Sequence, residues 1–282
     1  MEFVDALLST LTYLVSSFIL FAIGILAYRF FHKKIGIQHE LVERDNLAFS
    51  FAYIGYFVGL VMVVGGALIG ESKGIWVDVI NMFIYGILGV ILLNLAIKIN
   101  DIVILNRFKI YDEIISQKNI GTGIIEGANA IATGLILMGS IYGEGGGIVT
   151  AIVFWIVGQL LMILTSYIYN LITPYDVHEY IEKNNVAVGI GFAGAFIAIG
   201  NLIRQGLMVD FESWVITAEN VGFDVALGFI FLPIARLVTD KLILPGQNLT
   251  NELINQQKPN IGAAVVEAFA YIAGSVLISW SV

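Results

Sequence analysis

Long apolar runs separated by short polar segments dominate this chain. A helix of about 20 apolar residues crosses the hydrocarbon of a bilayer. By that criterion the sequence predicts eight membrane-spanning helices, over residues 4–31, 46–70, 75–98, 119–142, 147–172, 185–209, 214–238 and 260–282. The runs lack the apolar–polar alternation of a transmembrane strand and are about twice its length. We therefore expect an all-α, polytopic membrane helix bundle.

A second pattern is an internal repeat. Residues 39–46 (HELVERDN) return 139 positions later as residues 178–185 (HEYIEKNN). The same offset, without a gap, pairs Tyr28 with Tyr167 and Asp101 with Asp240. A match this long without slippage indicates one unit written twice. We expect two tandem four-helix membrane repeats, residues 1–142 and 143–282.

Within each repeat a shorter unit recurs. An asparagine stands at the start of every second predicted helix and is followed by an apolar and then a small residue. These asparagines are Asn46, Asn119, Asn185 and Asn260. A hairpin of two helices, about 70 residues long, thus occurs four times, and all four copies have the same orientation, as parallel repeats do. Asparagine is also a preferred helix cap, so capping is the favoured reading of its recurrence.

The seventh residue after each asparagine alternates between aromatic and acidic. It is Tyr53, Glu126, Phe192 and Glu267 in turn. Two helical turns place Asn119 with Glu126, and Asn260 with Glu267, on one face, each acid about 10 Å inside the helix start. A carboxylate at that depth is costly. It is either a neutral group in an interhelical hydrogen bond that helps packing, or a proton or cation site.

Other polar residues within the spans extend this picture. Asn129 continues the face of Glu126 in the second hairpin, and Asp224, near the middle of its span, is the most isolated acid. Arg204 and Glu219 lie at equal depth in successive helices. A lone charge there would be costly, so we expect them to form a structural ion pair.

Composition supports the membrane class and excludes several others. Apolar residues make up 58% of the chain and charged residues 13%, with a mean hydropathy of +0.88. Cysteine is absent, which removes disulfides, thiolate metal sites and cysteine nucleophiles, and three histidines offer little for a transition metal. Residues 189–194 fit G-x-G-x-x-G but lack the preceding strand of a nucleotide fold. We expect no enzyme, cofactor, metal site or nucleic-acid partner.

The basic residues predict the orientation. Twelve of the 14 Lys and Arg residues fall in the links after the first, third, fifth and seventh helices, or at the adjoining helix ends. The positive-inside rule places these links in the cytoplasm and both termini outside. Residues 111–117 and 175–182 within them read as short amphipathic helical turns. They are either headgroup-level connectors or a docking surface.

With four helices per half, Asn–apolar–small helix starts and an acid in each even hairpin, the chain resembles the YjfL-type bacterial inner-membrane proteins. Their shared domain is numbered as domain of unknown function 350. Members typically carry one four-helix unit, so this chain looks like two fused units. The resemblance implies a bacterial inner membrane and no established activity, and it carries over no catalytic residues.

We therefore expect a multi-pass inner-membrane protein that acts as a scaffold or assembly component, whose cytoplasmic links bind a partner. Partners compatible with this role are the lipid bilayer, a cytoplasmic or membrane protein, and further copies of the chain. The alternative is a proton or cation channel, or a small-solute transporter, that uses Glu126, Glu267 and Asp224. Conduction predicts that these acids line a continuous wet path, whereas a scaffold predicts that neighbouring groups cap each of them.

Overall fold

The computed structural model describes residues 2–69, 72–104, 109–142, 145–244 and 246–281. In these ranges the chain is helical, with no strand. Eight helices are long and apolar enough to cross a membrane, which confirms the predicted bundle. The expected turns at 70–74 and 143–147, and Arg107 among the basic link residues, lie wholly or partly outside the described residues.

The spanning helices follow the predicted runs closely. They are α1 (Glu2–Phe31), α2 (Leu47–Leu68), α3 (Ile75–Ile99), α4 (Ile120–Ile141), α5 (Ile148–Ile172), α7 (Val186–Leu207), α8 (Trp214–Val238) and α10 (Ile261–Ser281). Two of them run further than predicted, because α3 continues into the π-helical turn η2 (Asn100–Ile104) and α8 into η4 (Thr239–Ile243). The α-helices themselves end at Ile99 and Val238, within one residue of the predicted ends, but the π-helical turns were not predicted because the hydropathy criterion stops at the polar residues that they carry.

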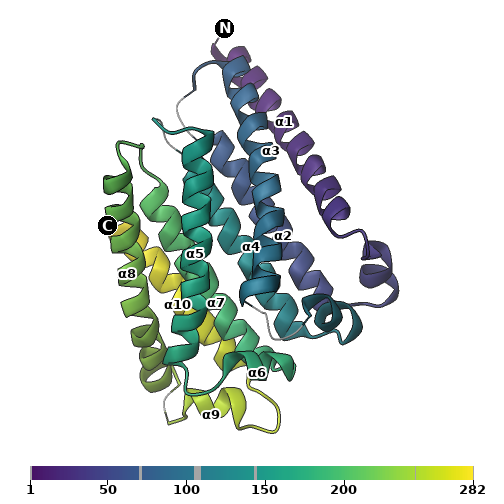
Figure 1. Cartoon of the computed structure of the whole chain (residues 1–282), viewed down its shortest axis with the longest axis vertical. Helices are drawn as coiled ribbons and strands as arrows, with labels where there is room; N and C mark the ends of the chain where they lie inside the picture. The colour runs from purple at the N-terminus through teal and green to yellow at the C-terminus, as the bar shows by residue number, and fades with distance from the viewer. Residues whose placement is uncertain (1, 70–71, 105–108, 143–144, 245, 282) are drawn as a thin grey trace.

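The helices form two layers. The second helix of each hairpin contributes to one layer, in which α2 packs on α4, α4 on α7, and α7 on α10 (Figure 1). The first helices, α1, α3, α5 and α8, make up the other layer; α3, α5 and α8 pack mainly against helices of the first layer, whereas α1 packs mainly against α3. Helices α2 and α10 lie at opposite ends (Figure 1). The four hairpins therefore form an open row in chain order.

Small residues allow the row α2–α4–α7–α10 to pack at backbone distance. A Cβ added to Gly55 of α2 would lie 2.2 Å from the Cα of Gly127 in α4. A Cβ on Gly189 of α7 would lie 2.7 Å from the Cα of Gly121 on the opposite face of α4. Such close approach increases van der Waals contact between helices in a bilayer. The predicted small-residue faces are thus the interfaces of the row.

The same positions show why the row ends after four hairpins. In α2 and α4, the residues 2, 9, 13 and 20 positions after the asparagine face the next hairpin. In α10 the same positions lie at the end of the row. They are Ala48, Gly55, Gly59 and Gly66 in α2, Gly121, Ala128, Ala132 and Gly139 in α4, and Gly262, Phe269, Ala273 and Trp280 in α10. Phe269 and Trp280 are 67% and 80% exposed. At the other end, exposed Ile54 and Val61 stand where α4 has Gly127 and Gly134. Both ends carry atypical terminal repeats.

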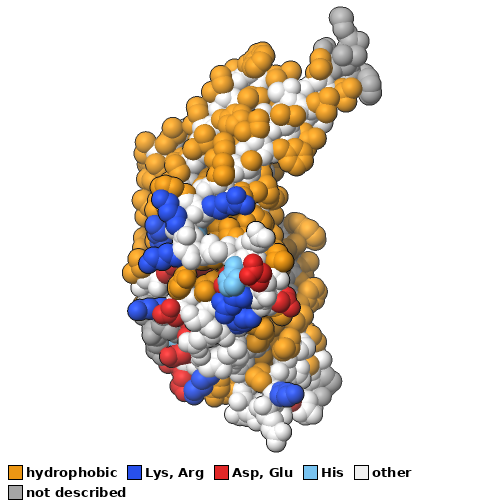
Figure 2. Space-filling view, turned by 90° about the vertical axis from the view of Figure 1, so that its right-hand side faces the viewer, with side chains coloured by type: hydrophobic (Ala, Val, Ile, Leu, Met, Phe, Trp, Pro, Cys, Tyr) orange, Lys and Arg blue, Asp and Glu red, His pale blue; other side chains and the backbone are white. Residues whose placement is uncertain are grey.

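Short polar helices lie in the links that connect the two helices of each hairpin, all at one end of the bundle, here called the link end. They are η1 (His39–Glu43), η3 (Asp112–Ser116), α6 (Val177–Glu182) and α9 (Leu249–Ile254). Helical turns within 111–117 and 175–182 are therefore confirmed. The chain termini point toward the opposite end (Figure 1). Figure 2 shows apolar side chains over the upper part of one face and charged side chains gathered toward the link end.

Two glycines of α2 provide a matched test of the packing. A Cβ on Gly59 would lie 2.4 Å from the carbonyl oxygen of Ala130, whereas a Cβ on Gly65 would meet nothing within 4 Å. We expect Gly59→Ala to lower the free energy of unfolding by about 1–3 kcal/mol, since α4 must move away. Gly65→Ala should change it by less than about 0.5 kcal/mol. SDS titration in bicelles measures both, and equal effects would contradict the packing.

Candidate functional site

The capping asparagines of the first two hairpins, Asn46 and Asn119, each bind both their own link and the following one. The Asn46 side-chain oxygen accepts the Phe49 N–H (3.2 Å), which confirms the cap. Its amide donates to the Glu40 carboxylate at 2.7 Å and to the backbone carbonyl of Ile114, in the link of the next hairpin, at 2.9 Å. Burial opposes ionisation of Glu40, but the bonds from Asn46 and Arg44 outweigh it and lower the pKa of that carboxyl. The first link is thus held by charge-assisted hydrogen bonds.

The pattern repeats along the row. Asn119 donates to Glu113 and to the carbonyl of Ile181, both at 2.7 Å, and Asn185 donates to the carbonyl of Leu253 at 2.9 Å. Asn260 caps α10 and donates to Glu252 at 2.8 Å, but it is exposed, and no carbonyl of a further link meets its amide among the described residues. Asn119 and Asn260 are therefore occupied at the link end and do not bind the glutamates seven residues further on.

The first half holds a buried acid site between α1, α3 and α4. Glu126 is only 6% exposed, and the amide of Asn100 in η2 donates to it at 2.5 Å. Asp101, the next residue of η2, and Tyr28 of α1 both interact electrostatically with Glu126. We call Tyr28, Asn100, Asp101 and Glu126 the first acid site. The sequence analysis missed Asn100 and Asp101 here because it ended the third span at 98, although the pairing of Asp101 with Asp240 was a signal.

The second half holds a corresponding site with different chemistry. Glu267 of α10 is fully buried, forms an ion pair with Arg236 of α8, and accepts a hydrogen bond from the Tyr271 hydroxyl (2.9 Å). The Arg236 guanidinium also donates to Thr250 (3.2 Å) and lies 5.7 Å from the centroid of the Tyr175 ring. Burial and then the nearby Glu267 carboxylate raise the pKa of Tyr175 to about 12, so its hydroxyl stays protonated at neutral pH.

The two sites also correct one pairing made from the sequence. Tyr28 is buried and its ring packs at a tilt against Tyr53 of α2, with centroids 5.0 Å apart. In the second half Tyr169 is buried and its ring packs at a tilt against Phe192 (5.1 Å), whereas Tyr167 is exposed. The counterpart of Tyr28 is therefore Tyr169 and not Tyr167. The offset fails there because the segment between this tyrosine and the capping asparagine is two residues shorter in the second half.

The expected ion pair between Arg204 and Glu219 does not form. Arg204 donates to the Asn201 side-chain oxygen (3.1 Å) and contacts the sulfur of Met208. The Glu219 side chain is exposed, and the described residues show no ion pair between the two. Equal depth on successive helices was not enough, because the Arg204 side chain bends back along its own helix.

Asp224 and Asn129 are buried but make no hydrogen bond to either acid site. Asp224 lies 12 residues before Arg236 on α8, which is about 18 Å along a helix, and no described side chain or backbone group makes a hydrogen bond to it. Asn129 is fully buried, and neither its amide nor its oxygen has a partner among the described residues. The structure therefore does not bring these two together with Glu126 or Glu267 in one network.

Open space in the molecule lies elsewhere. One surface pocket, toward the end opposite the links, is lined by residues that include Tyr13, Asp78 and Tyr85. Another lies beside the last link and includes Glu252 and Asn260. Neither is lined by Glu126 or Glu267. Among the described residues no group of three or more His, Cys, Asp or Glu side chains could hold a metal ion.

Two parallel four-helix units, each with one glutamate buried near the link end, define a multi-pass helical membrane protein built by duplication. The chain belongs to the family of the Domain of Unknown Function DUF350, whose model matches residues 2–141 and again residues 145–282. The resemblance inferred from the sequence is thereby confirmed.

Two relatives illustrate the family. A UPF0719 transmembrane protein of Aquifex aeolicus (strain VF5) is 19% identical over 251 residues, which is 88% of this chain and 90% of the relative. The UPF0719 inner membrane protein YjfL of Escherichia coli (strain K12) is 27% identical over 123 residues, 44% of this chain and 85% of the relative. YjfL thus matches over a stretch shorter than one half of this chain. No solved structure matches.

Removal of the arginine should expose how much the second site depends on it. Arg236→Gln leaves the buried Glu267 carboxylate without its cation, so we expect the free energy of unfolding to fall by about 3–5 kcal/mol. Lys241→Gln is the control, because it removes the largely exposed Lys241–Asp240 pair and should cost less than about 1 kcal/mol. Unfolding in bicelles measures both. Equal losses would show that the buried pair does not stabilise α8 against α10.

Proposed function

We propose that this protein is a scaffold of the bacterial inner membrane that docks a partner polypeptide beside its last link. The observation that carries the proposal is a difference in hydrogen bonding among the side-chain amides of the four capping asparagines. Those of Asn46, Asn119 and Asn185 each donate to a backbone carbonyl of the following link. The amide of Asn260 donates to Glu252 and has no such carbonyl among the described residues. The row of links therefore ends in an open position.

The surroundings of Asn260 suit one kind of occupant. The surface pocket there is lined by Leu244, Gln247, Glu252, Gln256, Lys258 and Asn260. In the other three copies the equivalent place is filled by a short helix of the following link, which presents a backbone carbonyl. The occupant we infer is therefore a short helical segment of another protein with a free carbonyl near its C-terminal end. Its side chains would meet one acid, one base and several amides.

The membrane face of α10 argues for docking at the link end and against a fifth hairpin in the bilayer. Phe269 and Trp280 occupy positions that are Ala128 and Gly139 in α4. A helix could not approach these two side chains as closely as α7 approaches α4. The partner segment therefore lies outside the hydrocarbon.

Charge supports a cytoplasmic position for this surface. Most Lys and Arg residues of the chain stand in or beside the links, which favours a cytoplasmic link end and termini on the other side. A relative is named an inner membrane protein, which supports the inner membrane as the location of this chain. The proposal includes no catalytic step.

Conduction through the acids is the rival function, and the contacts of the acids speak against it. Glu126 is bound by Asn100, and Glu267 by Arg236 and Tyr271, while the two surface pockets do not reach either acid. We expect purified protein in proteoliposomes to give no more proton, sodium or potassium flux than empty vesicles. Flux that Glu126→Gln or Glu267→Gln abolishes would establish the rival.

Docking is tested with a photo-crosslinking residue in place of exposed Gln256, beside Asn260. We expect light to join this chain to another polypeptide in native membranes, and Asn260→Ser to reduce the adduct at least tenfold. Serine still caps α10 but lacks the amide that donates to the partner. The measurement is the yield of adduct on a gel, followed by mass spectrometry of the captured segment.

Asn248→Ser is the matched control. Asn248 caps α9 by accepting the Asn251 N–H (3.0 Å), so this variant changes the same residue type in the same region without touching Asn260. It should leave the adduct unchanged. An adduct that survives Asn260→Ser, loses intensity equally in both variants, or never forms would overturn the proposal.

A further inference from the structure

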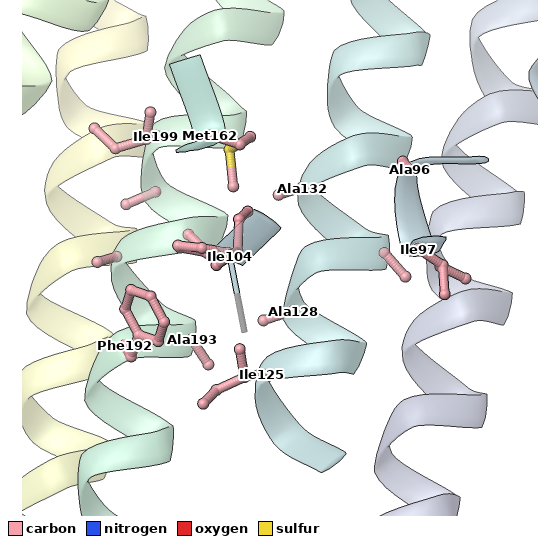
Figure 3. Close-up of a cluster of buried hydrophobic side chains, with 14 of the residues drawn as sticks. Ala96, Ile97, Ile104, Ile125, Ala128, Ala132, Met162, Phe192, Ala193 and Ile199 are labelled. Atoms are coloured by element: carbon pink, nitrogen blue, oxygen red, sulfur yellow. The ribbon is translucent and has the colours of Figure 1, made fainter. Parts of the chain in front are cut away.

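The two acid sites differ at one decisive position. Arg236, which neutralises Glu267, is 139 residues after Ile97, the offset that relates the two halves over this region. Ile97 is buried on α3 and lies beside α4 (Figure 3). The first acid site therefore has an apolar side chain where the second has a guanidinium.

The charge count differs accordingly. The second site contains two acids, Glu267 and Asp240, and two cations, Arg236 and Lys241, which pair with them one to one. The first site has Glu126 and Asp101 as its acids.

The cations near the first site are fewer. Lys98 interacts with Asp101, and its amino group also lies 4.8 Å from the centroid of the Phe31 ring. No described Lys or Arg forms an ion pair with Glu126. Among the described residues, the first site therefore has one positive charge fewer than the second, and an uncompensated carboxylate inside a membrane is costly.

The hydrogen bonds of the first site lack a donor, just as its charges lack a cation. Asn100 donates to one oxygen of Glu126. The side-chain oxygens Oδ1 of Asn100 and Oδ1 of Asp101 are buried and accept from no described group. Asn100 itself is fully buried. These oxygens are acceptors without a donor, and a carboxylic acid O–H is a donor.

We propose that the first acid site binds one exchangeable proton, held between Glu126 and Asp101, in place of the fixed charge that Arg236 supplies to the second site. One proton brings the first site to two acids and two positive charges. It also converts an acceptor oxygen into the missing donor. A multivalent metal ion fits less well, because it would need several more oxygen ligands, and the described residues hold no group that could bind one.

Other titratable groups face this site from the neighbouring helices. Helix α1 contributes Tyr28 and, at its end, His32, which stacks on Tyr28 with centroids 4.1 Å apart. Burial lowers the pKa of His32, so it is neutral at pH 7. Helix α2 contributes Tyr53 and Tyr56, whose rings pack against Tyr28. These groups are neutral near pH 7 and leave the charge count unchanged.

The remaining neighbour comes from the second half. His178 of α6 is bonded through Nε2 to the backbone carbonyl oxygen of Ile104, at the end of η2 (2.9 Å). Ile104 lies between α4 and α7 (Figure 3). His178 thus contacts the turn that carries Asp101, so a test must distinguish carboxyl groups from histidines.

Infrared difference spectroscopy makes that distinction, because protonated carboxyl groups absorb apart from imidazole and phenol. The full chain carrying Asp224→Asn, which removes the other isolated buried acid, is titrated in lipid nanodiscs from acid to alkaline pH. The exposed carboxyl groups titrate as well, so the reading is the difference between each variant and this background, and we expect one buried carboxyl group per chain to contribute a step of its own. Glu126→Gln, a nearly isosteric change, should abolish that step.

Two matched variants place the residue of one half at the equivalent position of the other half, at positions 97 and 236. Ile97→Arg supplies the missing fixed charge, so it should abolish the step without altering either acid. Arg236→Ile removes the fixed charge from the second site, so it should add a second titrating carboxyl, which Glu267→Gln then removes. Size-exclusion profiles and helical circular dichroism establish that each variant is folded. If Ile97→Arg does not fold, Glu126→Gln and Arg236→Ile decide the matter.

Three results would overturn the proposal. The first is a carboxyl step that persists in Glu126→Gln. The second is a step that responds to NaCl or KCl at constant pH, which would identify an alkali cation as the ligand. The third is an Arg236→Ile variant that is folded but gains no titrating carboxyl. None of these outcomes depends on whether a partner docks at Asn260.

Discussion

Backbone-to-backbone contact between the second helices of the hairpins is the constraint on which this structure depends. Helices α2, α4 and α7 approach at Gly55, Gly127, Gly121 and Gly189, and α7 approaches Ala268 of α10 at Gly194; at these glycines even a methyl group would meet main-chain atoms. In a bilayer, where burial of apolar surface gives little driving force, such packing contributes much of the association. It also sets the spacing of the hairpins, and so brings each link near enough for the preceding asparagine to reach its carbonyl.

The links and the acid sites follow from that spacing. The amides of Asn46 and Asn119 each donate to a carboxylate of their own link and to a carbonyl of the next, and that of Asn185 donates to a carbonyl of the last link, so hydrogen bonds join the four links. Within the bundle, each pair of hairpins encloses one glutamate. Divergence at a few positions, Ile97 against Arg236 and Asn100 against Thr239 among them, then gives the two enclosed glutamates different partners. Duplication thus preserved the packing and allowed the chemistry of the halves to differ.

Periodicity and repetition predicted the architecture, because helix length, small-residue faces and capping are local properties. The eight spans, the short link helices and the caps at Asn46 and Asn119 are confirmed. Side-chain contacts between helices were harder to predict from the sequence. Asn100 was missed because η2 extends α3 through polar residues, and Arg236 was counted as a link charge although it reaches Glu267 inside the bundle. Arg204 and Glu219 lie at similar depth, but their side chains point in different directions, which depth alone does not specify.

The central claim is that the four hairpins form a row whose end helices, α2 and α10, do not meet. The distance between these two helices tests it most directly. The chain has no cysteine, so spin labels at Ile54→Cys in α2 and Phe269→Cys in α10 report one distance by pulsed electron paramagnetic resonance. Both positions are exposed and lie about two helical turns inside their spans. Three helix spacings of 8–10 Å predict a backbone separation of about 24–30 Å. A separation of about 10 Å would mean that α2 and α10 are neighbours in a closed ring and would contradict the account.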